Sequence, residues 1–160
     1  MKLGDPKRRR WAVVLTSAAL FIVSLTQIAF VVDSPVMEGR PDLYSEVAWD
    51  LFFFGWLSAI FDLRYVAWFA NPLILATWHL YLRNAQVPSL VSAVLGLALA
   101  LSFLLVETIP HFPRDGFFGS IYSYGIGYWL WIASAAILVV GMSTEIALRY
   151  VGTTDDEPWI

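Results

Sequence analysis

Four long stretches without a charged residue constrain this chain more than any other feature of its sequence. They cover residues 11–32, 65–82, 84–106 and 116–144. A helix rises about 1.5 Å per residue and the hydrocarbon core of a bilayer is about 30 Å thick, so about 20 apolar residues cross it. The composition agrees, because 59% of the residues are hydrophobic and only 14% are charged. The sequence therefore predicts a chain whose solvent is lipid and argues against an ordinary water-soluble domain.

These stretches predict an all-α fold, an integral membrane four-helix bundle that forms a single membrane domain over residues 1–160. We place the four spans at about residues 11–32, 64–83, 88–106 and 123–147. A basic stretch before the first apolar run resembles a signal peptide. The run is longer than the usual 7–15 residues or so and has no small-residue cleavage site, so we expect an uncleaved anchor.

The segment 47–83 does not fit a single span. As one helix its 37 residues would be about 55 Å long, far more than the membrane core. We therefore expect an outer-surface helix at about residues 46–61, which is interfacial or re-entrant, before the second span. Pro72 is expected to kink that span, because proline removes a backbone hydrogen bond. In the alternative, the helix breaks at Asn71, with Asn71 as N-cap and Pro72 as the first helical residue.

The basic residues are divided unequally between the two sides of this arrangement. The N-terminal tail holds five of them, and Arg83 and Arg149 fall on the same side. Only Arg40, Arg64 and Arg114 fall on the other side. Because Lys and Arg are retained in the cytoplasm, we expect a multi-pass protein of the plasma (bacterial inner) membrane with both termini cytoplasmic.

Small residues mark a packing face on the third predicted span. Ser92, Gly96 and Ala100 follow one another at intervals of four, which places them on one side of a helix. In lipid, such residues let two helices approach closely. We expect this face to pack inside the bundle, with a subunit interface as the alternative.

Five polar or ionisable residues fall within or beside the predicted spans and are candidates for a polar cavity or gate. They are Gln27, Asp62, Arg64, Asn71 and His79. Charged groups at membrane depth often belong to functional sites. The simpler interpretation places Asp62 and Arg64 in water at the outer interface. Being two residues apart on a helix, they are not expected to face each other.

The residues that carry most enzyme chemistry are sparse. The chain has no cysteine, which excludes disulfides, thiolate metal ligands and thiol nucleophiles. Glu107, His111 and Asp115 recur every four residues like metal ligands on a helix, but Pro110 and Pro113 lie between them and disfavour that helix. We assign no catalytic residue, no cofactor and no metal site. The basic N-terminal cluster indicates a lipid bilayer as partner and no nucleic acid.

We favour a non-enzymatic function, as an accessory, scaffold or oligomeric subunit of a membrane complex. The partner would be a second copy of the chain or a larger complex. The expected docking surface is aromatic and lies on the outer side, where exposed rings have to meet lipid or protein. It comprises Phe53, Phe54, Trp56, Phe117 and Phe118.

Two other functions remain open. In the first, the chain is an oligomeric channel or transporter whose path is lined by the five polar residues named above. In the second, it is a membrane enzyme that acts on lipid at the outer face with Glu107, His111 or Asp115. That chemistry needs an acid and a base converging on one reacting atom.

Overall fold

A computed structural model describes residues 5–35, 41–110 and 118–154. Within these residues the chain forms five α-helices, two short 3₁₀ helices and one four-stranded sheet. The α-helices are α1 (Pro6–Leu25), α2 (Ala48–Phe61), α3 (Ala70–Leu82), α4 (Gln86–Ser102) and α5 (Ile126–Thr154). The 3₁₀ helices are η1 (Leu63–Phe69) and η2 (Phe103–Leu105). The strands are β1 (Ile28–Pro35), β2 (Pro41–Val47), β3 (Thr108–Pro110) and β4 (Phe118–Tyr124).

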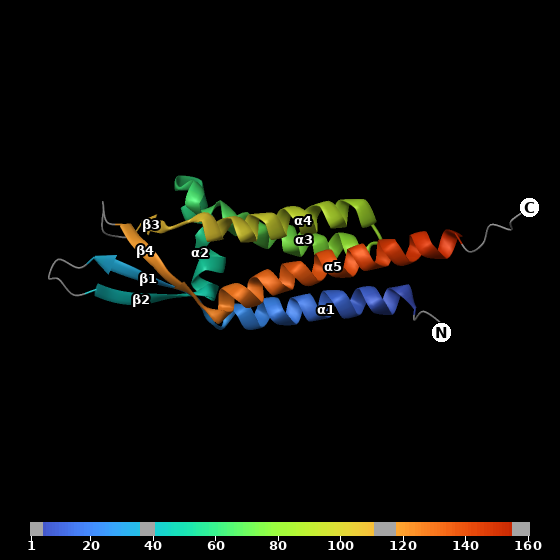
Figure 1. Ribbon diagram of the computed structural model, residues 1–160, viewed down its shortest axis with the longest axis horizontal. Helices are drawn as coiled ribbons and strands as arrows, with labels where there is room; N and C mark the ends of the chain where they lie inside the picture. The colour runs from blue at the N-terminus through green and yellow to red at the C-terminus, as the bar shows by residue number, and fades with distance from the viewer. Residues whose placement is uncertain (1–4, 36–40, 111–117, 155–160) are drawn as a thin grey trace, which may run out of the picture.

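The long helices and the sheet occupy opposite ends of an elongated molecule. Figure 1 shows α1, α3, α4 and α5 running along the long axis, with the sheet extending beyond one end. The start of α1 and the end of α5 lie together at the other end. Helix α2 lies across the long axis where helices and sheet meet (Figure 1). The segments Gln86–Leu105 and Ile126–Arg149 are the two helices, among the described residues, that are long and apolar enough to cross a membrane.

The sheet shows that the all-α prediction was wrong. Its strand order is β2-β1-β4-β3, and every neighbouring pair is antiparallel. Strand β1 occupies the end of the predicted span 11–32, because α1 stops at Leu25 and turns at Thr26. Residues 28–32 are an unbroken apolar run with Val31 and Val32 adjacent. Because every residue of such a run is apolar, its hydrophobic pattern cannot distinguish a buried strand from a helix. The β-branched residues favour the strand.

The other strands come from segments predicted as loops. β4 pairs with β1 from Phe30↔Tyr124 onward, and with β3 at Thr108↔Ser120. The last helix therefore begins at Ile126 rather than at residue 123. The four predicted spans reduce to two helices that meet the length and hydropathy needed to cross a bilayer. The other two long helices fall short, since α1 begins among arginines and the continuous helix η1–α3 contains Arg64, Asn71 and His79.

The segment 47–83, which is too long for a single span, divides into two helical parts at Asp62. Ala48–Phe61 forms α2, within the predicted outer helix 46–61. Helix α3 starts at Ala70 and continues directly from the 3₁₀ helix η1. Asn71 and Pro72 therefore lie in the first turn of α3, and Asn71 does not act as its N-cap. The structure shows neither a mid-span kink nor a break at Asn71. Instead, the helix changes from 3₁₀ to α geometry just before these residues. Pro72 is tolerated because the backbone nitrogens of the first turn of an α-helix donate no hydrogen bond within the helix.

Two hydrophobic clusters hold the fold together. The first lies between the long helices and includes Phe21, Ile74, Tyr81, Leu138 and Met142. The second lies where the helices meet the sheet and includes Phe30, Val32, Phe103, Ile109 and Tyr128. The second cluster forms one side of the candidate functional site.

Candidate functional site

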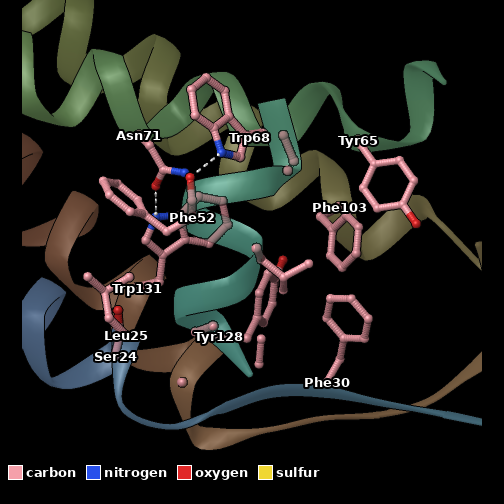
Figure 2. A pocket seen from close by; sticks show the side chains of 16 residues that line it. Ser24, Leu25, Phe30, Phe52, Tyr65, Trp68, Asn71, Phe103, Tyr128 and Trp131 are labelled. Atoms are coloured by element: carbon pink, nitrogen blue, oxygen red, sulfur yellow. Dashed lines mark hydrogen bonds between the residues drawn. The ribbon is translucent and has the colours of Figure 1, made fainter. Parts of the chain in front are cut away.

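A cavity of ≈ 90 Å³ lies where α2 crosses between the long helices and the sheet. A buried water needs about 10–15 Å³ on this measure, so the cavity has room for roughly six to nine water-sized groups. Its lining comes from seven elements and includes no charged side chain among the described residues. Figure 2 shows the ring-bearing members of the lining, which are Phe30, Phe52, Tyr65, Trp68, Phe103, Tyr128 and Trp131.

Asn71 supplies the central polar group of this cavity. Its side chain is buried, with 7% of the residue exposed. The indole Nε1 of Trp131 donates a hydrogen bond of 2.9 Å to Asn71 Oδ1 (Figure 2). Because an indole N–H only donates, the amide oxygen has to face Trp131, and this fixes the amide nitrogen on the other side. Among the described residues, Asn71 Nδ2 has no acceptor.

The aromatic walls are held in place by hydrogen bonds of their own. Trp68 Nε1 donates to the backbone oxygen of Phe52 at 2.9 Å, and the Tyr128 hydroxyl donates to the backbone oxygen of Ala100 at 2.9 Å. Gly55 allows Trp68 to lie against α2, since a Cβ at Gly55 would be 2.6 Å from Trp68 Cδ1. The rings are thus positioned before any ligand arrives, which lowers the entropic cost of binding.

A second, wider hollow of ≈ 330 Å³ adjoins the cavity on the side of the sheet. The two hollows share four lining residues, Phe30, Leu51, Gly55 and Tyr65. The wider one also carries Glu46 and Asp50, so its lining is acidic. Burial, followed by the nearby Glu46 carboxylate, raises the pKa of the Tyr44 phenol above its ordinary value, so Tyr44 keeps its proton.

Asp62 and Arg64 pair with each other, so the expectation that they would not face each other was wrong. Arg64 Nε lies 3.3 Å from Asp62 Oδ1, and the Arg64 backbone N–H donates to the same oxygen at 2.9 Å. Asp62 is extended and forms the N-cap of η1, so helical spacing does not apply to this pair. Arg64 Nη1 also donates to the backbone oxygen of Thr108 at 3.1 Å, which ties η1 to the sheet.

The five polar residues predicted to line a path are not brought together. Gln27 lies in the turn after α1, and its Nε2 donates to Thr26 Oγ1 at 2.9 Å. His79 is exposed in the last turn of α3. Of the five, only Asn71 lines the aromatic cavity.

The small-residue face packs against α3 within the same chain. Ser92 Oγ donates to the backbone oxygen of Leu73 at 3.0 Å. A Cβ at Gly96 would lie 3.3 Å from Leu73 Cβ, and Ala100 is fully buried. This contact holds α4 against α3 and leaves the opposite side of α4 exposed.

The predicted outer surface is described in part. Phe53, Phe54 and Trp56 are exposed on α2, where Leu57, Ile60 and Phe61 join them. Phe117 and the side chain of Phe118 lie outside the described residues.

Most of the series Glu107, His111 and Asp115, whose spacing resembled that of metal ligands, lies outside the described residues. Glu107 is exposed, whereas His111 and Asp115 are outside the described residues. In the part of the chain that is described, no three His, Asp or Glu side chains gather as metal ligands would.

A buried carboxylate that the sequence did not single out links three helices at the end opposite the sheet. Only 6% of Glu145 is exposed. Arg10 Nη2 of α1 and Arg149 Nη2 of α5 each lie 2.7 Å from Glu145 Oε1. The Tyr81 hydroxyl of α3 donates to Oε2 at 2.8 Å. The available signal was that Glu145 is the first charge after the uncharged run 116–144.

The aromatic cavity and the Glu145 cluster differ in what their geometry allows. The aromatic cavity presents rings and one free amide donor, which suit the capture of an apolar molecule. The Glu145 cluster has its hydrogen bonds satisfied by three partners and serves to join helices. Comparisons of this chain with protein families, with curated proteins and with solved structures gave no match, so the functional assignment rests on the geometry of the chain itself.

Proposed function

We propose that this protein is an oligomer-forming scaffold subunit of a membrane complex, assembled through the exposed face of α2. It would span the plasma membrane of a bacterium with α1, η1–α3, α4–η2 and α5, both termini cytoplasmic and the sheet outside. Support for the membrane comes from the two long apolar helices α4–η2 and α5. The uncharged part of α1, residues 11–25, is about 22 Å long, and arginines at its start can extend their charged heads to the lipid headgroups.

The observation that carries the proposal is the exposed aromatic surface of α2. Phe53, Phe54, Trp56, Ile60 and Phe61 are all exposed on one 14-residue helix. A water-facing helix would place polar residues at most of these positions. Large rings are enriched at the centres of subunit interfaces, and charged groups are depleted there.

The position of α2 favours assembly beside the membrane. The helix lies across the long helices, at the level where they meet the sheet (Figure 1). If the long helices cross the bilayer, α2 runs along the outer interface, where aromatic residues settle. A second copy in the same membrane has the same orientation and depth. Its α2 therefore meets this surface at the same level, which lowers the cost of association.

The test replaces Phe53, Phe54 and Trp56 together by alanine in the full chain. The wild-type chain, purified and placed in lipid nanodiscs or mild detergent, is expected to form an oligomer. The triple variant is expected to associate at least tenfold more weakly, because truncating central aromatic residues removes most of an interface's binding energy. Light scattering coupled to size-exclusion chromatography measures the mass of the assembly.

The matched control replaces three exposed apolar residues of α4, Val91, Val94 and Leu95, by alanine. These side chains face away from α2's surface, and the control variant should keep the wild-type mass. Membrane insertion of both variants is followed by carbonate extraction. A monomeric wild-type chain in both lipid and detergent, or an unchanged mass for the α2 variant, would contradict the proposal.

A further inference from the structure

One hydrogen-bond donor of the aromatic cavity is left without an acceptor. Asn71 Nδ2 lines the cavity on a residue that is more than nine-tenths buried. Rotating the amide does not relieve it, since Trp131 Nε1 would then face an N–H group instead of Oδ1. Asn71 Nδ2 is not among the fully enclosed unpaired atoms of the described residues, so it is accessible from the cavity, and an amide donor in an apolar site without an acceptor is unfavourable. The cavity is therefore built for a molecule that brings an acceptor oxygen.

The side chains that line the cavity indicate the charge and shape of the molecule that would bind there. Apart from Ser24 and Asn71, the lining of the cavity is aromatic and aliphatic, and none of the described residues places a charged side chain in it. Nothing there would balance a carboxylate or a phosphate, and burying such a charge unpaired is costly. Stacked and edge-on rings favour a flat, uncharged partner. Room for roughly six to nine water-sized groups accommodates one six-membered ring with its oxygens.

The adjoining hollow selects against anionic lipid headgroups. Glu46 and Asp50 line it, next to the residues that both hollows share. A phosphate group placed there would lie beside two acidic side chains, which is unfavourable. An uncharged polar group meets no such barrier. A molecule that enters through this hollow is thus expected to carry no anionic group.

We infer that the aromatic cavity binds an uncharged apolar carbonyl compound whose carbonyl oxygen accepts a hydrogen bond from Asn71 Nδ2. Two sources in a membrane carry this chemistry, the ring carbonyl of a quinone and the ester carbonyl of a neutral lipid. The flat ring and the aromatic walls favour the quinone. The cavity lies on the inner side of α2, and its own lining contains none of Phe53, Phe54 and Trp56. Phe54 lines the adjoining hollow, so the proposed assembly surface borders the entrance but not the binding site itself.

Photolabelling tests this inference on the full chain in nanodiscs. The nanodiscs are made of diether phosphatidylcholine, which has no ester carbonyl, and the probe is a short-chain benzoquinone with a photoreactive azide. Labelling is expected to saturate and to map to residues 67–71 and 127–131. A decyl-substituted benzoquinone should compete with the probe, and decylbenzene, which has no carbonyl, should not.

Two variants of the cavity and one control sharpen the test. Asn71→Leu removes the donor and should weaken binding about tenfold, the loss that one neutral hydrogen bond accounts for. Ala67→Leu fills the cavity while keeping the Asn71 amide in the chain and should weaken binding at least tenfold. Gln27→Leu removes an amide that does not line the cavity and should leave binding unchanged. Circular dichroism and elution volume verify that each variant is folded.

The outcomes distinguish the sources and can overturn the inference. If adding diacylglycerol, an uncharged lipid with ester carbonyls, to the diether nanodiscs abolishes quinone labelling, the native carbonyl belongs to a lipid ester. Labelling that diacylglycerol leaves unchanged assigns the site to the quinone. Competition by decylbenzene as strong as that by the quinone, or labelling that is unchanged in both Asn71→Leu and Ala67→Leu, would overturn the inference.

Discussion

The Glu145 cluster offers a comparison of two arginines that bind the same oxygen at the same distance. Arg10 Nη2 and Arg149 Nη2 are each 2.7 Å from Glu145 Oε1. Their side chains differ in exposure, at 12% for Arg10 and 47% for Arg149. Arg10 also donates from Nε at 2.9 Å, which makes its contact two-pronged. Distance alone predicts equal effects on stability, whereas burial predicts unequal ones.

The magnitudes follow from that difference in burial. Removing one partner of a buried ion pair costs about 3–5 kcal/mol, because the remaining charge is left buried without compensation. Arg10→Met should cost about 3 kcal/mol, the lower end of that range, since Tyr81 and Arg149 still donate to Glu145. The Arg149 side chain is about half-exposed, so water can replace much of its contact with Glu145, which keeps Arg10 and Tyr81 as partners. Arg149→Met should therefore lower the free energy of unfolding by no more than about 1 kcal/mol.

Unfolding in mixed micelles of dodecyl maltoside and sodium dodecyl sulfate, followed by helical circular dichroism, measures these free energies. The double variant Arg10→Met with Glu145→Leu should recover most of the loss, because no buried charge then lacks a partner. The reasoning fails if the two arginine variants are equally stable. It fails also if the double variant is less stable than Arg10→Met alone.

Two further predictions concern packing and topology. Gly141→Ala should destabilise the fold by about 1–3 kcal/mol, because its Cβ would lie 2.7 Å from both methyl carbons of Val13. Val13→Ala in the same chain should restore stability in the micelle assay, and no recovery would place the clash elsewhere. A reporter enzyme that is active only in the periplasm should be inactive when fused after Ile160 and active when fused after Glu107. Activity after Ile160 would contradict a cytoplasmic C-terminus.

Elements built from local signals were predictable from the sequence. A helix was expected at about residues 46–61 because they are largely apolar and are followed by the charged Asp62 and Arg64, and α2 occupies residues 48–61. The span expected at 88–106, from its apolar run and Pro88, corresponds to the helix of 86–102. Both helices depend on signals within a few residues of the chain. The spacing of the small residues marked one face of that helix, but not the helix against which it packs.

The candidate site was predicted only through Asn71. The sequence marked Asn71 as a polar residue at membrane depth, but it grouped this residue with Gln27 and His79, which lie elsewhere. The hydrogen-bond partner of Asn71, Trp131, donates from a different helix. That pair is separated by 60 residues, and nothing in either local sequence specifies the other.

What the sequence determined by itself is the inventory of apolar segments and the turns between them. Whether each segment becomes helix or strand, and what faces it, was decided by tertiary contacts. Residues 28–32 were predicted as the end of a helix and residues 33–35 as the start of a loop, whereas strands 41–47 and 118–124 supply hydrogen-bond partners on both edges of β1. A helix satisfies its backbone within itself, whereas a strand satisfies it only through distant segments. For the same reason the partners of Glu145 and Asn71 emerged only when the helices were packed.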